Sequence, residues 1–295
     1  MIDAVIPYVD SSDRYWNKDF NKATQQYNTN TPRFRSWGTL RYLVRAISTN
    51  MPFIRRIVLI VARESQVPIW VNEENIKVVY HRDFIPQQFL PTFNSCTIEA
   101  FLYRIDDISE QFVYFNDDMF PINKLDTTDF FEGNIPCIKF NVRHEYKKTM
   151  FRQQCRHSLD IMASTLNVPS YPAQDLLLPE HSLSSMLKSS INDVGQKCEK
   201  QIYDSITLLR NPRNINQYIY LYYQYFTGDY VDNNISYYYT ELDTDMSSIK
   251  QIILGNDFHI VCINDSDKIK DYKKTREELL AIFEEKFPHK CKYEV

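Results

Sequence analysis

Apolar runs and amphipathic stretches alternate over the first 120 residues of the chain. Four apolar runs predict buried strands, at residues 2–9, 57–61, 76–80 and 112–115. Between them, residues 39–49 and 96–105 place apolar side chains at intervals of three and four, which predicts amphipathic helices. This order of strands and helices is typical of a mainly parallel sheet with crossover helices. We therefore expect an α/β fold with a Rossmann-like core.

The pattern changes after about residue 145 and predicts a mainly helical second half. Helices are expected at residues 150–166, 181–195, 218–226 and 274–287, and one further buried strand at 258–263. Residues 229–248 are polar, acidic and rich in Tyr, which predicts an exposed loop or insertion. Residues 289–295 are expected to form a frayed tail. We expect two parts, 1–145 and 146–295, which together make one functional domain.

Composition narrows the possible functions. The chain has 295 residues and only 5 Gly, which argues against a glycine-rich phosphate loop. Its 21 Tyr and 18 Phe predict that the core, and the lining of any sugar-binding cleft, is aromatic. A net charge of −4 gives no case for nucleic-acid binding. The sequence contains no GxSxG, P-loop, GxGxxG or HExxH motif, so a serine hydrolase, a P-loop kinase and a classical dehydrogenase are poorly supported.

The cysteines and the apolar segments indicate the cellular compartment in which we expect the chain. Six cysteines are scattered without a CxxC pair, which argues against a structural zinc site. The start of the chain lacks the pattern of a secretory leader, and no run approaches the about 20 apolar residues that a spanning helix needs. We expect free thiols in the reducing cytoplasm, with attachment to the inner face of the membrane left open.

The most informative candidate site is the triplet Asn116, Asp117 and Asp118, directly after the strand expected at 112–115. The carboxyl ends of strands are where ligands bind in open α/β folds. Two adjacent carboxylates there suit a divalent cation and, through it, a diphosphate. Asp and Asn also favour ordinary turns and helix caps, and the triplet alone does not decide between the two readings.

Two further groups could bind phosphate. The loop from Asp10 to Asp13 follows the first strand and could hold a nucleotide, although an ordinary capping turn is the simpler reading. Arg33, Arg35, Arg41 and Arg45 could bind phosphate oxygens through their guanidinium forks. A solvated helix face is the alternative for these arginines.

A general base for a hydroxyl is expected among the histidines. His181 is the first candidate, and Lys188 would lie two helical turns later on the same face. His157 and His81 are alternatives, and a structural role is common for a lone histidine. Arg210 lies at a predicted helix boundary and could clamp a phosphate or pair with an acidic surface.

Taken together, these segments resemble the Stealth family of sugar-phosphate transferases. The segment IDAVIPYVDSSD at 2–13 resembles its opening block. Residues 33–71 and the specific LPTFNS…IE…NDDMF stretch at 90–120 resemble its second block, and HSLSSMLKS at 181–189 and the aromatic run after Arg210 resemble two weaker blocks. The chain departs from the family pattern at Asp10, where Asn is usual, and at Ser11, where Gly is usual. It departs again at Leu183 and Ser185, where a Pro is usual at one of the two.

The resemblance implies a nucleotide-sugar-binding core and a defined reaction. A hexose-1-phosphate, such as N-acetylglucosamine-1-phosphate, would pass from a UDP-sugar to a sugar hydroxyl of a surface or capsular polysaccharide, with UMP leaving. Asp117 and Asp118 would hold Mg²⁺ or Mn²⁺ or move a proton, and His181 would be the base. Arg33, Arg45 and Arg210 would neutralise phosphate oxygens. The residues expected to bind substrate are Asp10, Asp13, Arg33, Arg45, Asn94, Glu99, Asn116 and Lys188.

The expected reaction implies binding partners, and two alternative functions stay open. The partners would be a UDP-sugar donor and an oligosaccharide or polysaccharide acceptor, with peripheral association with membrane glycan-assembly machinery and no nucleic acid. One alternative is a metal-dependent UDP-sugar glycosyltransferase that uses the same carboxylates. Another is a non-catalytic glycan-binding relative that keeps the fold.

Overall fold

A computed structural model describes residues 1–25, 31–32, 34–232 and 234–295. The chain forms two compact units whose segments interleave along the sequence. Unit 1 comprises Met1–Ile2, Tyr80–Tyr114 and Thr127–Asn234, and unit 2 comprises Asp3–Val79, Phe115–Asp126 and Ile235–Val295. The sequence pattern changes near residue 145, whereas each unit draws on both sides of that position.

Unit 2 contains the strands predicted at the start of the chain. β1 (Ile2–Pro7), β2 (Ile54–Val61) and β3 (Ile76–Tyr80) lie side by side in this order. The N–H of Tyr8, just past β1, donates to the carbonyl of Ile60 near the end of β2 at 2.8 Å. The carboxyl ends of β1 and β2 therefore coincide, as in a parallel sheet. The predicted α/β class is confirmed.

The helix predicted between these strands is present as α2 (Leu40–Asn50), which buries its apolar face. Its packing partner includes β5 (Met119–Pro121), the short strand that follows the Asn-Asp-Asp triplet. α1 (Arg14–Thr24) follows the first polar loop and buries Trp16 and Phe20.

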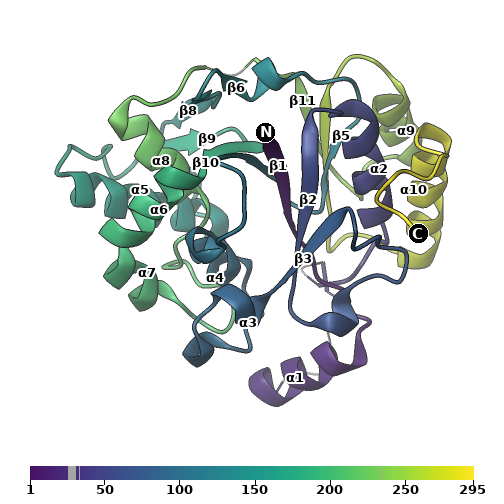
Figure 1. Cartoon of the computed structure of the whole chain (residues 1–295), viewed down its shortest axis with the longest axis horizontal. Helices are drawn as coiled ribbons and strands as arrows, with labels where there is room; N and C mark the ends of the chain where they lie inside the picture. The colour runs from purple at the N-terminus through teal and green to yellow at the C-terminus, as the bar shows by residue number, and fades with distance from the viewer. Residues whose placement is uncertain (26–30, 33, 233) are drawn as a thin grey trace. The chain divides into compact units, whose positions relative to one another are not determined.

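A second sheet in unit 2 contains a strand that the sequence analysis missed. β11 (Tyr237–Glu241) pairs parallel with β12 (Ile260–Asn264), and β12 pairs antiparallel with β5. The helices α9 (Met246–Leu254) and α10 (Tyr272–Lys286) pack against each other (Figure 1). The expectation of an exposed loop or insertion over 229–248 is thus wrong for residues 237–241, which form an edge strand with half-buried Tyr237 and Tyr238.

The C-terminal tail is anchored rather than frayed, which corrects a second expectation. Tyr293 is buried, and the N–H of Asn72 donates to its carbonyl at 2.9 Å. The N–H of Val295 donates to the carbonyl of Trp70 at 3.0 Å. The buried Glu294 carboxylate pairs with Arg45, so the tail contributes to the core of unit 2.

Unit 1 is built around two helices that the sequence analysis predicted. α5 (Met150–Leu166) packs against the aromatic helix α8 (Tyr218–Thr227), whose side chains are mostly buried. The other larger elements of the unit are α4 (Ser95–Ala100), β4 (Gln111–Tyr114), β8 (Phe140–Arg143), β9 (Leu176–Pro179), β10 (Ser184–Leu187), α6 (Lys188–Lys197) and α7 (Glu199–Ser205). Shorter ones are α3 (His81–Phe84), β6 (Phe131–Glu132) and β7 (Ile135–Pro136).

The helix predicted over 181–195 is wrong in its first half. β10 (Ser184–Leu187) pairs antiparallel with β4 in this region, and α6 begins only at Lys188. Ser184, Ser185 and Met186 are buried by this pairing, so sheet formation overrides the local helical pattern. The separation of His181 and Lys188 therefore does not measure two helical turns.

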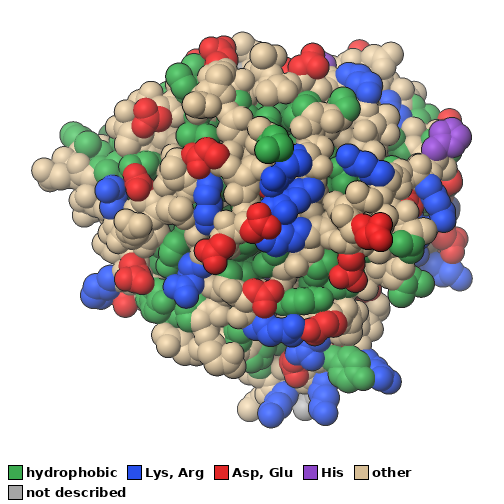
Figure 2. Space-filling view, in the orientation of Figure 1, with side chains coloured by type: hydrophobic (Ala, Val, Ile, Leu, Met, Phe, Trp, Pro, Cys, Tyr) green, Lys and Arg blue, Asp and Glu red, His purple; other side chains and the backbone are tan. Residues whose placement is uncertain are grey.

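The remaining expectations concern thiols, membrane spans and surface charge. Five cysteines are buried and one is half-buried, and all six are free. Among the described residues, no helix has both the length and the apolar character needed to cross a bilayer. On the face drawn in Figure 2, acidic and basic side chains intersperse.

Candidate active site

The Asn-Asp-Asp triplet lies where the sequence analysis expected it, directly after β4. The main chain of unit 2 holds it on two sides. The N–H of Phe115 donates to the carbonyl of Val5 in β1 at 2.9 Å, and the N–H of Ile263 in β12 donates to the carbonyl of Asp118 at 2.9 Å. The side chains of Asn116, Asp117 and Asp118 are half-buried. The main chain that carries the two carboxylates is therefore held by hydrogen bonds to β1 and β12.

The negative charge of these carboxylates affects the pKa values of Cys262 and Tyr8. Burial, reinforced by Asp118 and then Asp117, raises the pKa of the Cys262 thiol well above its ordinary value. Burial also raises the pKa of the Tyr8 hydroxyl, where Ser36 and Arg276 act in the opposite direction and Asp10 and Asp117 add to the rise. Tyr8 thus senses carboxylates from two different strand ends and one guanidinium.

The loop after β1 contains hydrogen bonds typical of a turn, and its Asp10 acts on Tyr8 together with Asp117 of the triplet. The N–H of Asp10 donates to Gln66 Oε1 at 2.7 Å, and Gln66 Nε2 donates back to the Asp10 carbonyl at 2.9 Å. Asp10 Oδ1 also accepts from the N–H of Ser12 at 2.8 Å. Asp13 caps α1 by accepting from the N–H of Trp16 at 2.7 Å. Asp13 therefore has a capping role, whereas Asp10 lies within the field that acts on Tyr8.

Arg276 is a cation of this cluster that the sequence analysis missed. A Cβ atom built on Gly38 would lie 2.5 Å from Arg276 Nη2, so the guanidinium occupies the space beside the glycine backbone. Gly38 has a φ of +72°, and its N–H donates to Ser36 Oγ at 3.3 Å. Ser36 Oγ lies 3.5 Å from the hydroxyl of Tyr8.

The charge of Arg276 is not neutralised by an ion pair within the described ranges of the chain. This sets it apart from Arg35, Arg45 and Arg55 of the same unit, each of which pairs with a carboxylate. Arg276 lies on α10, far from the other candidate residues in the sequence, and it is part of no recognised motif. The sequence alone therefore did not indicate a role for it.

Arg35 has a structural partner close by. Its Nε donates to Asp265 Oδ2 at 2.5 Å, its Nη2 pairs with Asp265 Oδ1 and also donates to the Ser266 carbonyl at 2.8 Å. Trp37 Nε1 donates to the same carboxylate at 3.0 Å, and the guanidinium lies over the rings of Trp37 and Tyr272. This network joins the segment before α2 to the end of β12.

Arg45 and Arg41 also lie in ion pairs and do not join the cluster around Tyr8. Arg45 is 5% exposed; its Nε donates to Glu294 Oε1 at 2.7 Å and its Nη2 to Glu294 Oε2 at 3.0 Å. Arg41 lies 3.3 Å from the same carboxylate and stacks over Trp70. The phosphate-binding role expected for Arg45 therefore gives way to a bidentate structural pair. Arg33 lies outside the described residues.

In unit 1, Asn94 and Glu99 hold one loop in place. Asn94 caps α4 and donates from Nδ2 to Asn214 Oδ1 at 3.0 Å and to the Thr207 carbonyl at 3.1 Å. Glu99 is buried and accepts from the N–H of Gln217 at 2.9 Å, and burial raises the pKa of its carboxyl group. Both buried side chains bind segment 207–217 from the inside.

Arg210 is an exposed residue of this loop. Its Nη2 donates to Ser95 Oγ at 2.6 Å, beside the first turn of α4. Its positive charge lowers the pKa of Glu99 against the larger effect of burial. The structure thus brings Arg210 together with Asn94 and Glu99 and leaves the Arg210 side chain exposed to solvent.

His181 is half-buried between two aromatic side chains of unit 1. Its Nδ1 lies 3.4 Å from the hydroxyl of Tyr218, and its ring meets Phe151 edge-on at 5.7 Å between centroids. Lys188 Nζ instead donates to the carbonyls of Tyr103 at 2.7 Å and Ile105 at 2.6 Å. Lys188 thus fixes the segment after α4.

The two alternative histidines differ from His181 in their surroundings. His81 is 6% exposed, and burial lowers its pKa to about 4. Burial also lowers the pKa of His157, against the effect of Asp160. A buried imidazole such as that of His81 cannot reach an incoming hydroxyl.

The carboxylates of the triplet meet part of the requirement of a divalent cation. In the parts of the chain that the structure describes, no three His, Cys, Asp or Glu side chains are grouped to hold a metal ion. Mg²⁺ commonly uses one or two carboxylates together with substrate phosphates and water. Asp117 and Asp118 are hard oxygen donors that fit this mode, in which a diphosphate completes the ligand set.

Comparison with known proteins extends beyond these local features. The chain is 29% identical to a capsular polysaccharide phosphotransferase, WcwK, of Streptococcus pneumoniae, over 99% of this chain and 98% of the relative. It is 28% identical to a capsular polysaccharide phosphotransferase of Actinobacillus suis, over 95% and 81% of the two chains. The solved structure of the galactosyltransferase LgtC, in complex with donor and acceptor sugar analogues, matches 95% of this chain and 96% of its own at 11% identity, with a TM-score of 0.41.

A family match covers the segment that contains Asn94, Glu99 and the Asn-Asp-Asp triplet. Residues 33–137 match Stealth protein CR2, conserved region 2. This range includes the LPTFNS…IE…NDDMF stretch on which the predicted resemblance mainly rests. The resemblance of the chain to the Stealth family is therefore confirmed, with conserved region 2 at residues 33–137.

Proposed function

We propose that the chain transfers a hexose-1-phosphate from a UDP-sugar to a sugar hydroxyl of a growing surface or capsular polysaccharide. The chain is a transferase of the phosphotransferase class, like the relatives whose names state that activity. The observation that carries the proposal is the cluster of unit 2, where Asp10, Asp117 and Arg276 all act on Tyr8, with Asp118 next to Asp117. Carboxylates and a guanidinium that act on the same tyrosine suit a metal-bound diphosphate.

The donor diphosphate would be bound by unit 2. Arg276 would pair with non-bridging phosphate oxygens, because a guanidinium fork matches their geometry. Asp117 and Asp118 would hold Mg²⁺ or Mn²⁺, which when bound neutralises charge on the diphosphate. Asp10 and Asn116 would contribute polar contacts at the same strand ends. In unit 1, Arg210 is a separate candidate for a phosphate-binding cation, on the loop that Asn94 and Glu99 hold.

The reaction would take place at phosphorus and not at the sugar carbon. The acceptor oxygen attacks the phosphorus that carries the sugar, and a new P–O bond forms as the bond to the bridging oxygen breaks. UMP leaves with the electrons of that bond, and the C1–O bond of the sugar is retained. Catalysis of this step consists mainly of alignment and charge stabilisation.

The acceptor proton requires a base, and His181 is our choice for it. Its ring is half-buried and is held by contacts with Phe151 and Tyr218, which orient it. His81 is too deeply buried for this role. Free cysteines fit a cytoplasmic setting, and we propose peripheral association with glycan-assembly machinery at the inner face of the membrane.

The competing function is ordinary glycosyl transfer from the same donor, which would also use a carboxylate-bound metal ion. The nucleotide product separates the two reactions. Purified chain would be incubated with a panel of UDP-sugars, with Mg²⁺ or with EDTA, and nucleotides would be separated by anion-exchange chromatography. Metal-dependent UMP supports the proposal, and UDP as the product refutes it. Saturable glycan binding without turnover of any donor would favour the non-catalytic alternative.

A further inference from the structure

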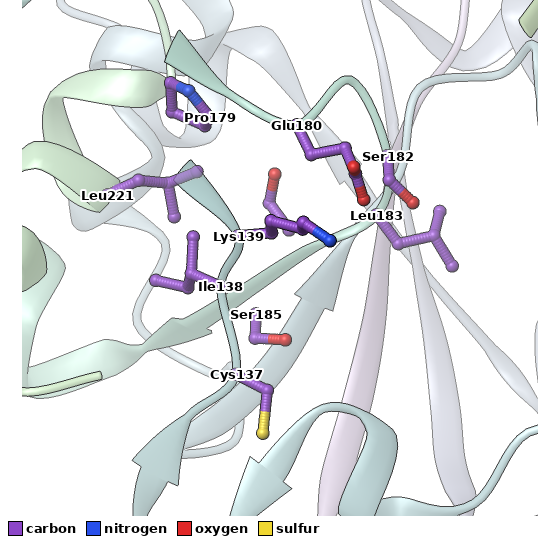
Figure 3. A pocket seen from close by; sticks show the side chains of 10 residues that line it. Cys137, Ile138, Lys139, Pro179, Glu180, Ser182, Leu183, Ser185 and Leu221 are labelled. Carbon is purple, nitrogen blue, oxygen red and sulfur yellow. The ribbon is translucent and has the colours of Figure 1, made fainter. Parts of the chain in front are cut away.

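A small pocket in unit 1 is lined in part by Glu180 and Ser182, the two sequence neighbours of His181. It is lined by the connection between β9 and β10, by residues 137–139 and by Leu221 of α8 (Figure 3). Its volume is about 10 Å³, the room that a single water molecule or hydroxyl group takes. The pocket therefore admits one small polar group and not a whole sugar ring.

Three polar side chains of this pocket lack protein partners. Ser185 is fully buried, and its Oγ makes no hydrogen bond within the described structure. Lys139 Nζ and the Glu180 carboxylate are half-buried, and neither pairs with another side chain that the structure describes. Burial raises the pKa of the Glu180 carboxyl group, and the charge of Lys139 opposes this rise only in part.

A buried hydroxyl without a partner is unfavourable unless a water molecule or a ligand satisfies it. The other two groups restrict what that ligand can be. An anion such as phosphate would be repelled by Glu180, and a cation by Lys139. A neutral hydroxyl can accept from the ammonium and donate to the carboxylate.

We propose that this pocket binds one hydroxyl group of the acceptor sugar. Lys139 donates to the hydroxyl oxygen, Glu180 accepts its proton in a hydrogen bond, and Ser185 makes the third contact. His181, our choice for the base, follows Glu180 directly in the chain. The inference rests on the proposed function and adds a recognition site for the acceptor.

The test uses methyl glycosides as acceptors, since they present single sugar rings of known configuration. Acceptor KM and kcat would be measured from UMP release for the methyl glycosides of glucose, galactose and N-acetylglucosamine, and then for monodeoxy forms of the best one. We expect one deoxy position to raise KM about tenfold in the wild type, the effect of one lost hydrogen bond of about 1.4 kcal/mol. Glu180→Gln and Ser185→Ala should each abolish this discrimination.

Matched controls separate recognition from general damage. Glu132→Gln and Lys147→Met change exposed side chains of the same unit and should leave the acceptor KM unchanged. The donor KM should stay at its wild-type value in Glu180→Gln and Ser185→Ala. Unchanged discrimination in both pocket variants, or a parallel change in the donor KM, would overturn the inference.

Failure of the pocket can be told apart from failure of the proposed function. If the wild type releases no UMP from any donor, the proposed function fails, and the pocket is then tested by saturation-transfer NMR with the same methyl glycosides. Binding that Glu180→Gln removes would support the site. Binding that Glu180→Gln leaves intact, or no binding to the wild type at all, would refute it.

Discussion

Gly38 and Arg276 fit together in a way that any side chain at position 38 would disturb. A Cβ atom on Gly38 would lie 2.5 Å from Arg276 Nη2, closer than nonbonded atoms approach. The φ of +72° at Gly38 is also one that residues with a side chain rarely adopt. The glycine thus leaves space for a guanidinium beside Tyr8 and the carboxylates of unit 2.

This relationship predicts that Arg276 determines affinity for the diphosphate of the donor. Arg276→Met should weaken binding of UDP by about 10–100-fold, the effect of losing a charge-assisted hydrogen bond of about 1.5–3 kcal/mol. Binding of uridine, which has no phosphate, should be unchanged. Gly38→Ala should weaken UDP binding in the same direction because the new methyl group displaces the guanidinium. Isothermal titration calorimetry measures all of these affinities.

The matched control is Lys273→Met, which removes the same charge from an exposed position of α10. It should alter UDP affinity by less than about threefold, as expected for a screened surface charge. The double variant Gly38→Ala, Arg276→Met should bind UDP no more weakly than Arg276→Met alone. Additive losses would contradict a shared origin in the guanidinium.

Asp117 is expected to be essential for turnover but not for folding. Its side chain is half-buried at a strand end, so Asp117→Asn keeps the volume and removes the charge. We expect kcat to fall by at least about 100-fold, with the thermal midpoint changed little. Steady-state UMP release and circular dichroism would test this. A variant that retains most of the turnover would remove Asp117 from the mechanism.

Arg45 is expected to act on stability and not on donor affinity. Arg45→Met would leave Glu294, whose side chain has 0% exposure, without its bidentate partner. Breaking a buried pair in this way commonly costs about 3–5 kcal/mol in the free energy of unfolding. Urea denaturation would measure the loss, and Arg82→Met, at an exposed arginine, should cost less than about 1 kcal/mol. A fully stable Arg45→Met with a raised donor KM would restore the phosphate-binding role.

The buried His81 predicts a pH dependence of stability. Its pKa is about 4 in the folded chain, against an ordinary value of 6.5, because burial disfavours the charged ring. At pH values between these two pKa values, the unfolded chain binds more protons than the folded chain. The free energy of unfolding should therefore decrease as pH falls from 6.5 toward 4. His81→Leu should flatten this part of the curve, as followed by urea denaturation at several pH values. Parallel curves for the variant and the wild type would contradict the assignment.

The elements predicted correctly are those in which one local pattern extends over the whole segment. The strand predicted at 76–80 coincides with β3, and the helix predicted at 150–166 coincides with α5. Residues 181–195 failed because the apolar spacing there fits a helix, whereas pairing with β4 buries Ser184–Leu187 as a strand. That pairing partner lies about 70 residues earlier in the chain and leaves no trace in the local pattern.

The candidate site was predicted only in part for a related reason. The sequence identified Asp117 and Asp118 because a motif surrounds them, and the structure places them at a strand end. Arg45 looked like a phosphate ligand until the C-terminal Glu294 was seen to pair with it. Arg276 was not predicted because it contacts Gly38 from a position far along the chain. Contacts of this kind depend on tertiary structure, which spacing alone does not encode.

The most direct test of the proposed reaction follows the phosphorus atom itself. A UDP-sugar labelled with ³²P at the β-phosphate would be incubated with the chain, Mg²⁺ and a methyl glycoside acceptor. Sugar-1-phosphate transfer predicts that the label passes to the acceptor product and that the UMP released is unlabelled. Label that remains in UDP, with an unlabelled glycoside product, would contradict the account and establish glycosyl transfer instead.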